Sequence, residues 1–248
     1  MTASAEVSAA SPSRRILITG GSAGIGLGVV EQLVRQGNQA VVLARTPPAL
    51  TGAEFFAVDL ADRVATARTM AAVLDAGPID GVVNNVGLVR PALLGQVDLD
   101  DLMAVYDLNV RAAVQVTQAA LPGMLQRGWG RVVNISSLVT VGLPERTAYG
   151  AAKAALEFLT RAWAGELATT GITVNSVAPG PTETALFREN NPVGSPGEAR
   201  YIAAVPMRRL GRPAELAAAV CFLLADEAGY ISGQTLRVDG AASTGRSG

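Results

Sequence analysis

Short runs of apolar, β-rich residues alternate with helical stretches along most of the chain, and this alternation constrains the fold more than any other feature. It is typical of a parallel sheet that is covered by helices on both faces and binds ligands at the carboxyl ends of its strands. We therefore predict a single α/β domain of the doubly wound, Rossmann type, with about seven strands. Six of the expected strands are Arg15–Thr19, Gln39–Ala44, Glu54–Val58, Ile79–Asn84, Arg131–Ser136 and Ile172–Ala178.

The connection between the second and third expected strands differs from the others. Residues 46–53 include Pro47, Pro48 and Gly52. Proline and glycine both disfavour a helix interior, so we expect no full helix in this crossover.

Length and composition fit one enzyme-sized domain. The chain has 248 residues, of which 49% are hydrophobic, enough for a sizeable core. We expect a single domain over residues 14–248. The first 13 residues are rich in Ala, Ser and Thr and lack a periodic pattern, so we expect them to form a disordered tail.

Composition also excludes several classes of function. The chain contains no histidine and one cysteine, which removes the common zinc sites, and we expect no metal. The net charge of -1, without a basic block, argues against a nucleic-acid partner. No apolar run reaches the length of a membrane helix, and the start of the chain does not have the pattern of a secretory signal. Cys221 lies in an apolar helical stretch and suits a reducing compartment, so we expect a cytoplasmic protein.

A glycine-rich loop follows the first expected strand. Gly20, Gly24 and Gly26 would allow a tight turn and bring bare backbone N–H groups and a helix N-terminus toward a phosphate. The spacing is Gly-x-x-x-Gly-x-Gly rather than Gly-x-Gly-x-x-Gly, so a nucleotide loop and an ordinary strand-to-helix turn both remain open. The same loop matches the Gly-x-Ser-x-Gly pattern of a hydrolase at Ser22, but the absence of histidine rules out a Ser-His-Asp triad.

Tyr149 and Lys153 form a candidate acid–base pair. Residues four apart project from one face of a helix, so the lysine ammonium can lie beside the phenol. A nearby cation favours the phenolate and lowers the pKa of a tyrosine. The pair could then exchange a proton with a carbonyl or alcohol oxygen. Taken alone, the spacing is more typical of ordinary residues on a helix surface.

These motifs occur together with others in a recognisable order, and from Arg15 to Ala242 the chain resembles the short-chain dehydrogenase/reductase family, in particular its 3-oxoacyl-[acyl-carrier-protein] reductases. Each motif is weak alone, but the ordered set is specific. The matching residues are Thr19-Gly20-x-x-x-Gly24-Ile25-Gly26, Asp59, Asn84-Asn85-x-Gly87, Asn109, Ser137, Tyr149, Lys153, Pro179-Gly180 with Thr184, and Gly233-Gln234-Thr235-x-x-Val238-Asp239-Gly240.

The resemblance implies hydride transfer between a nicotinamide cofactor and a ketone or secondary alcohol, with a small ketone or a 3-oxoacyl thioester as substrate. Tyr149 would pass the proton, and Lys153 would lower its pKa and hold the ribose. Ser137 would stabilise the substrate oxygen, and Asn109 would hold a water in the proton relay. Asn109 could instead be a buried amide at a helix kink. The implied cofactor residues are Gly20, Ser22, Gly24, Ile25, Gly26, Arg45, Asp59, Leu60, Asn85, Gly87, Tyr149, Lys153, Pro179, Gly180, Thr182 and Thr184.

Two adjacent serines compete for the active-site role. Strand alternation places Ser136 and Ser137 on opposite faces, so only one can face the substrate. The family pattern selects Ser137, whereas the usual spacing back from Tyr149 selects Ser136. We prefer Ser137, because the loop 138–148 absorbs a one-residue deletion more easily than a strand does.

The end of the second strand indicates the cofactor. An NAD-selective site would carry an acid there, but the chain has Ala44 followed by Arg45. A guanidinium binds phosphate strongly, so we expect NADP(H) rather than NAD(H). The second basic residue of many NADP-using relatives would fall at Ala23. Arg45 could also be only a solvated residue at the end of the strand.

Three further expectations concern the lid, the assembly and a second class of function. Residues 185–210 look like a mobile lid, whose arginines would either bind an anionic substrate tail or face solvent. The apolar residues of the helix that begins near Tyr149 indicate the family's homotetramer, unless the fold itself buries that helix. The alternative function is a catalytically silent dinucleotide-binding sensor or scaffold, although the Ser, Tyr and Lys set is complete.

Overall fold

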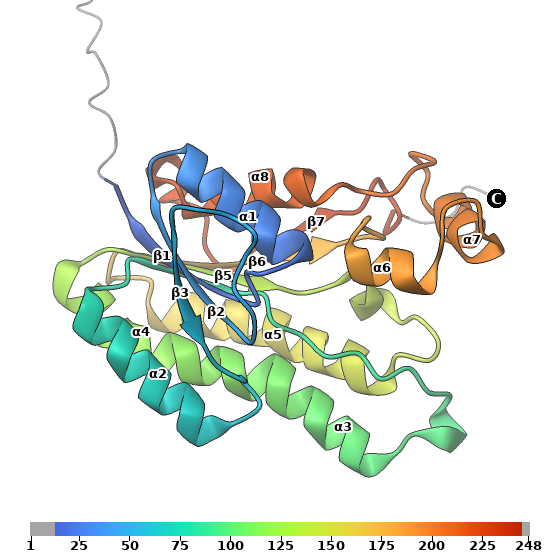
Figure 1. The fold of residues 1–248 in the computed structure, drawn as a ribbon, viewed down its shortest axis with the longest axis horizontal. Helices are drawn as coiled ribbons and strands as arrows, with labels where there is room; N and C mark the ends of the chain where they lie inside the picture. The colour runs from blue at the N-terminus through green and yellow to red at the C-terminus, as the bar shows by residue number, and fades with distance from the viewer. Residues whose placement is uncertain (1–12, 245–248) are drawn as a thin grey trace, which may run out of the picture.

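The computed structural model describes residues 13–244 and contains a seven-stranded sheet in which all neighbouring strands are parallel (Figure 1). The strand order is β3-β2-β1-β4-β5-β6-β7. The strands are β1 (Arg15–Thr19), β2 (Gln39–Ala44), β3 (Ala53–Ala57), β4 (Gly81–Asn84), β5 (Gly130–Ile135), β6 (Ile172–Pro179) and β7 (Thr235–Val238). This order confirms the doubly wound α/β prediction.

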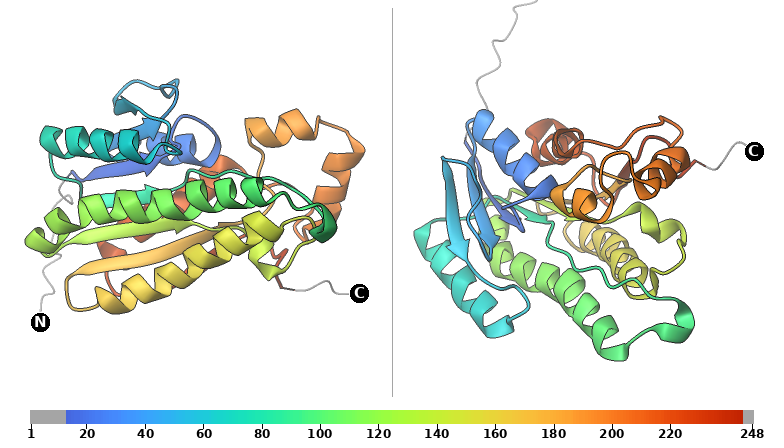
Figure 2. Two further views of the ribbon diagram at one scale, coloured as in Figure 1. Left: turned by 90° about the horizontal axis from the view of Figure 1, so that it is seen from below. Right: turned by 45° about the vertical axis from the view of Figure 1, so that its right-hand side comes forward.

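Helices cover both faces of the sheet. One face carries α1 and α8, and the other carries α2, α4 and α5, of which α4 and α5 run side by side (Figures 1 and 2). The short α6 and α7 stand apart at one end of the sheet. The helices are α1 (Gly24–Arg35), α2 (Arg63–Ala76), α3 (Leu99–Tyr106), α4 (Ala112–Arg127), α5 (Thr147–Glu166), α6 (Ala185–Asn190), α7 (Pro196–Ala204) and α8 (Pro213–Leu224).

The alternating side chains of β1 show how the sequence fills both layers. Ile16 and Ile18 pack into the cluster beneath α1 and α8, whereas Leu17 packs into the cluster beneath α2 and α4. All three side chains are buried. Successive residues of a strand point to opposite faces, so a strand buried on both sides reads as a continuous apolar run. Truncating Leu17 to alanine is expected to cost about 2–5 kcal/mol.

The predicted strand positions agree closely with the structure. The bounds of β1 and β2 match, and residues 46–52, between β2 and β3, contain no helix. The strand predicted from Ile79 begins at Gly81, because Asp80 instead uses its backbone N–H to bind Arg15 O. Apart from Ser13, the predicted tail lies outside the described residues. None of the described helices has the length and hydropathy of a membrane span.

The topology creates a crevice where the strand order reverses. β1 lies between β2 and β4, so the chain leaves β1 and β4 toward opposite faces of the sheet. Ligands of open α/β sheets bind outside the carboxyl ends of the strands at such a point. Gly20 follows β1 there, and Asn85 follows β4.

Candidate active site

The glycine loop has the backbone geometry that its residues predict. Gly20 and Gly24 have φ angles of +68° and +56°, which favour glycine. A Cβ on Gly26 would lie 2.3 Å from Gly20 O, so this position has no room for a side chain. No side chain caps the start of α1, and its first turn holds no acidic residue. Its N–H groups and the positive end of its dipole are therefore free to bind phosphate.

Thr19 and Asn85 hold the loop against the end of β4. The Thr19 hydroxyl accepts hydrogen bonds from the backbone N–H of Asn85 at 2.9 Å and of Val86 at 3.1 Å. The Asn85 side chain donates to Thr19 O and Gly20 O at 3.0 and 3.1 Å. Asn85 thus braces the glycine loop through its side chain, a structural task that its motif did not specify.

Tyr149 and Lys153 lie one turn apart near the start of α5. The Lys153 ammonium is 5.5 Å from the centroid of the Tyr149 ring and donates a 2.7 Å hydrogen bond to Ile135 O of β5. Burial lowers the pKa of Lys153 to about 7. Burial also raises the pKa of the Tyr149 phenol, whereas the Ser137 side chain and the Arg146 charge lower it. Desolvation therefore dominates both groups and shifts the two pKa values in opposite directions, so the lowered Tyr149 pKa predicted from Lys153 is not seen: the pKa is raised, and Lys153 is not among the groups that lower it.

The two serines after β5 point to different partners. The Ser136 side chain is buried and donates to the Glu157 carboxylate at 2.7 Å. The Ser137 side chain is only partly buried and lies near enough to the Tyr149 phenol to influence its pKa. This geometry favours Ser137 as the serine of the acid–base group, as the sequence predicts, and its catalytic role remains a prediction.

Asn109 lies in η2 (Asp107–Arg111), a single π-helical turn between α3 and α4. Its amide nitrogen donates to Leu88 O at 2.9 Å and to Val105 O at 2.8 Å. Its oxygen is buried and has no hydrogen-bond partner within residues 13–244. A Cβ on Gly87 would lie 2.9 Å from this oxygen and 3.5 Å from the Lys153 nitrogen. The amide nitrogen therefore stabilises the π turn, and the amide oxygen presents an acceptor near Lys153. Both the structural role at a helix kink and the role in a proton relay thus have support.

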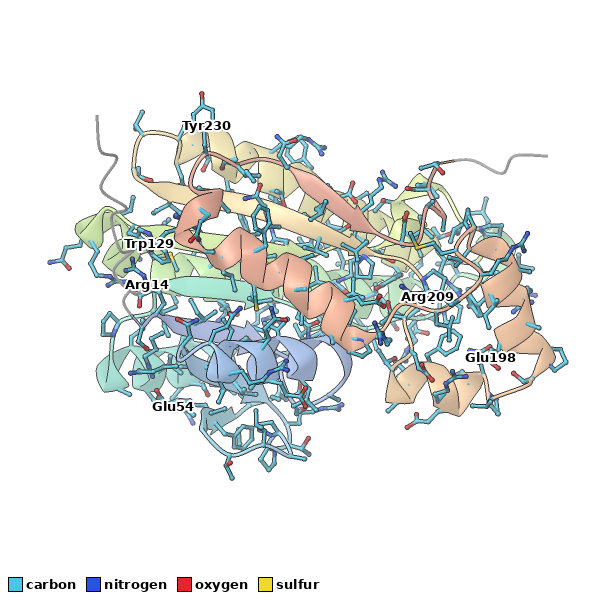
Figure 3. All side chains as sticks on the ribbon, turned by 90° about the horizontal axis from the view of Figure 1, so that it is seen from above. Arg14, Glu54, Trp129, Glu198, Arg209 and Tyr230 are labelled. Atoms are coloured by element: carbon cyan, nitrogen blue, oxygen red, sulfur yellow. The ribbon has the colours of Figure 1, made fainter. Side chains whose placement is uncertain are left out.

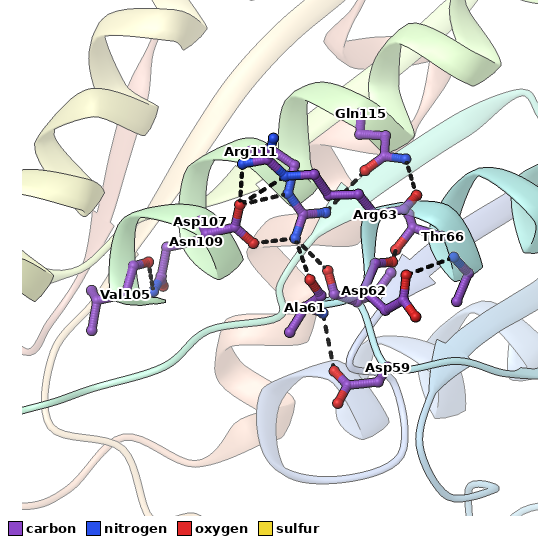
Figure 4. Close-up of polar contacts among 12 residues, drawn as sticks. Asp59, Ala61, Asp62, Arg63, Thr66, Val105, Asp107, Asn109, Arg111 and Gln115 are labelled. Carbon is purple, nitrogen blue, oxygen red and sulfur yellow. Dashed lines mark hydrogen bonds and ion pairs between the residues drawn. The ribbon is translucent and has the colours of Figure 1, made fainter. Parts of the chain in front are cut away.

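The loop after β3 is attached to this π turn. Asp59 accepts a hydrogen bond from Ala61 N, and the guanidinium of Arg111 donates to Leu60 O at 2.8 Å and to Ala61 O at 3.2 Å. Arg111 also pairs with Asp107, at the other end of the turn (Figure 4). No sequence motif indicated Arg111. The only available signal was its spacing of four from Asp107.

Arg45 follows the end of β2, and its side chain is exposed. Gly20 N donates to Leu43 O at 2.8 Å, which fixes the glycine loop against this strand end. The exposed guanidinium, the uncapped start of α1 and the side-chain-free position at Gly26 are features that suit a phosphorylated dinucleotide.

The segment after β6 returns to the glycine loop. A Cβ on Gly24 would lie 3.2 Å from the methyl group of Thr184, so these two predicted cofactor residues face each other. Thr184 caps α6, and Thr182 donates to Gly180 O at 2.9 Å. A Cβ on Gly180 would lie 2.7 Å from the Cα of Asp239, which explains the glycine after Pro179.

Residues 185–210 contain α6 and α7 rather than an irregular loop. Arg188 pairs with Glu183 and Glu198, and Arg209 pairs with Glu215. In Figure 3, Glu198 and Arg209 lie at the end of the molecule opposite Trp129 and Arg14. Two of the arginines considered for an anionic substrate tail thus already have carboxylate partners.

The remaining predicted cofactor residues lie around the same crevice. Ser22 and Ile25 are partly buried in the glycine loop and the first turn of α1, and Leu60 is buried after β3. A cavity of about 530 Å³ adjoins the start of α5, with Leu93, Leu94, Leu143 and Arg146 among its lining residues. These lining residues come from the loop after β4 and from the segment between β5 and α5.

Comparison with known proteins places the chain in a family. The family model described as enoyl-(acyl carrier protein) reductase matches residues 20–243. The chain is 35% identical over 234 residues to the 3-oxoacyl-[acyl-carrier-protein] reductase FabG of Vibrio harveyi, covering 90% of this chain and 95% of that protein. It is 34% identical over 244 residues to the acetoacetyl-CoA reductase of Allochromatium vinosum, covering 92% and 98%.

A solved structure with the same fold is described as a candidate NAD(P)-dependent gluconate 5-dehydrogenase from Beutenbergia cavernae, with NADP bound at low occupancy. It superposes with a TM-score of 0.89 at 30% identity, covering 95% of this chain and 98% of that one. With these matches and the sheet order described above, the chain belongs to the short-chain dehydrogenase/reductase family of oxidoreductases.

Proposed function

We propose that the protein is an NADP(H)-dependent oxidoreductase that interconverts a ketone and a secondary alcohol. The observation that carries this proposal is the convergence of Ser137, Tyr149 and Lys153 beside a glycine loop with an uncapped helix start. The three side chains can transfer a proton to or from a carbonyl oxygen, and the glycine loop with the helix start can bind a dinucleotide.

Different residues of the chain would bind the different parts of the cofactor. The glycine loop and the start of α1 would bind the pyrophosphate, Arg45 the 2′-phosphate, Asp59 and Leu60 the adenine, and Thr182 and Thr184 the nicotinamide end. When bound, the cofactor supplies or accepts the hydride. Ser137 would donate a hydrogen bond to the substrate oxygen, and this bond strengthens as negative charge develops there.

Tyr149 would donate its proton to the same oxygen during reduction. Burial raises the pKa of the phenol, so Tyr149 carries its proton at neutral pH and needs a nearby cation to stabilise the phenolate that forms when it donates. Lys153 would bind the ribose hydroxyls and stabilise the phenolate that remains. Asn109, with its free oxygen near the Lys153 nitrogen, would hold the water through which the proton is replaced.

We propose a 3-oxoacyl thioester as the substrate class, with small ketones as weaker substrates. The names of the Vibrio and Allochromatium relatives support this choice. The family model's description names reduction of a carbon–carbon double bond instead, so an enoyl thioester is the second candidate. The bound NADP of the Beutenbergia structure and the exposed Arg45 support NADP(H).

The test is a substrate panel with both cofactors. Purified protein would be assayed for oxidation of NADPH and of NADH with acetoacetyl-CoA, a longer 3-oxoacyl thioester, a simple ketone and crotonyl-CoA. We expect the largest kcat/KM with NADPH and a 3-oxoacyl thioester. Turnover of crotonyl-CoA alone would favour the enoyl reaction. Tight NADPH binding without turnover of any carbonyl would support the silent sensor or scaffold.

We also propose a homotetramer. One face of α5 is exposed in the single chain, including Ala151, Ala154 and Phe158, whose exposure is 63%. The helix is thus not buried wholly within its own fold, and such an apolar face suits an interface. Sedimentation velocity should give four times the monomer mass, and a purely monomeric species would reject the proposal.

A further inference from the structure

Glu157 lies behind the candidate active site on the helix that carries Tyr149 and Lys153. The three residues recur every four positions along α5. Residues at this spacing share one side of a helix. Glu157 belongs to none of the sequence motifs and has no task in the roles proposed above.

A single carboxylate oxygen of Glu157 binds two hydroxyl groups. Its Oε1 accepts a hydrogen bond from Ser136 Oγ at 2.7 Å and another from Thr140 Oγ1 at 3.0 Å. Hydrogen bonds to an ionised acceptor are stronger and more directional than those between neutral groups. Glu157 therefore joins α5 to two points that flank Ser137 in the chain.

Both points also fix the backbone of Ser137. Ser136 N pairs with Val177 O of β6 at 2.8 Å, which continues the sheet by one residue. Thr140 Oγ1 also lies 3.0 Å from Ser137 O, so its single hydroxyl hydrogen is shared between this carbonyl and the Glu157 carboxylate. The Ser137 hydroxyl in turn accepts from Val139 N at 3.3 Å, inside the short helical turn η3 (Leu138–Val141). The orientation of Ser137 thus depends on a turn that Glu157 attaches to α5.

Apart from Glu145 O, which accepts a hydrogen bond from Ala92 N at 3.2 Å, the rest of this loop offers little other support. Residues 141–145 are all exposed, and Gly142 and Glu145 have φ angles of +93° and +61°. Exposed backbone without packed side chains is easily displaced. The carboxylate of Glu157 is therefore a principal anchor between this loop and the helix of Tyr149.

We infer that Glu157 is a positioning residue for Ser137. Through Ser136 and Thr140, its carboxylate sets the distance between the Ser137 hydroxyl and the Tyr149 phenol. The inference rests on the proposed function, because this distance matters only if both hydroxyl groups act on one substrate oxygen. It also assigns a role to Ser136, the serine not chosen for catalysis: its bond to Glu157 helps to position Ser137.

The test compares three classes of variant by steady-state kinetics, with NADPH affinity from fluorescence titration and Tm from thermal unfolding. Glu157→Leu should lower kcat between about 10-fold and 100-fold, because a small displacement of a catalytic group is costly. NADPH affinity should not change. Glu157→Gln keeps an acceptor oxygen at the same place and should recover most of the lost kcat.

Ser136→Ala removes one of the two bonds to Glu157, and Thr140→Val removes the other together with the contact to Ser137 O; each should lower kcat by a smaller factor than Glu157→Leu. Either change added to Glu157→Leu should cause little further loss, because the three residues act as one unit. These two milder variants also test the inference if Glu157→Leu does not fold. The matched control is Glu166→Leu, an exposed glutamate at the end of the same helix, which should leave kcat unchanged.

Three outcomes would contradict the inference. An active wild type with the same kcat in Glu157→Leu, Ser136→Ala and Thr140→Val would overturn it and leave the proposed function standing. Equal losses in Glu157→Gln and Glu157→Leu, accompanied by weaker NADPH binding, would indicate a general structural role instead. A wild type without any carbonyl reductase activity would overturn the proposed function, and this inference with it.

Discussion

The ammonium of Lys153 lies 5.5 Å from the centroid of the Tyr149 ring, and its hydrogen bond to Ile135 O holds it there against β5. Lys153 is buried and Tyr149 is partly buried, and desolvation disfavours the charged form of each. In the proposed reaction this pair would exchange a proton with the substrate oxygen without a histidine, which the chain lacks. It also gives the lysine a measurable effect on stability.

Stability should rise with pH between about 7 and 9 because of Lys153. Its folded pKa is lowered to about 7 from the ordinary 10.5, so in this window the unfolded state binds one more proton than the folded state. The free energy of unfolding then increases with pH, by up to about 2 kcal/mol over two units. Chemical unfolding of the wild type and of Lys153→Met at several pH values measures this effect. The variant should lack this part of the slope, and parallel curves would show that Lys153 keeps its charge when folded.

Arg45→Gln should weaken NADPH binding and leave NADH binding unchanged. Loss of the charged hydrogen bonds to a 2′-phosphate corresponds to a Kd about 10-fold to 100-fold higher. Fluorescence titration with both cofactors measures the change, with Arg68→Gln, an exposed arginine of α2, as the control. Equal effects on the two cofactors would mean that Arg45 does not contact the phosphate.

Gly26→Ala should disrupt the nucleotide loop. The new Cβ would lie 2.3 Å from Gly20 O, and the backbone must move to relieve this contact. We expect a loss of about 1–3 kcal/mol in stability and a marked loss of NADPH affinity. The control is Gly165→Ala on α5, where a Cβ meets nothing within 4 Å and an alanine favours the helix. Unchanged NADPH binding in Gly26→Ala would contradict the assignment of this loop to the cofactor.

Ser137→Ala should be far more damaging than Ser136→Ala. A hydrogen-bond donor to a developing oxyanion contributes about 100-fold to 1000-fold to kcat. Ser136 is expected to act only through its bond to Glu157 and should cost no more than about 10-fold. Comparison of kcat in the two variants at saturating NADPH separates the roles, and the reverse order of effects would assign the catalytic serine to Ser136.

Local patterns were enough to predict most of the sheet. β1 and β2 are buried on both faces and bounded by glycine or polar residues, so hydrophobic runs locate them well. The proline-rich interval after β2 likewise indicated a crossover without a helix. The start of β4 was placed two residues early, because Ile79 is buried and apolar without pairing in the sheet.

The features that the sequence did not reveal depend on contacts between distant segments. The π turn around Asn109 requires Leu88 O as a partner of the side chain, and no local pattern encodes that contact. The task of Glu157 depends on the position of Thr140 after folding. The start of α7 could have been predicted from the sequence, because Ser195, Pro196 and Glu198 match the pattern of a capped helix start.

The assignment of Tyr149 as the proton donor is tested most directly by the turnover of Tyr149→Phe, a substitution that removes one hydroxyl and leaves the ring in place. NADPH oxidation with a 3-oxoacyl thioester would be measured beside NADPH affinity, in the wild type and in the variant. We expect a fall in kcat between about 100-fold and 10,000-fold with the NADPH Kd unchanged. A variant that retains most of its turnover would contradict the assignment of Tyr149 as the proton donor.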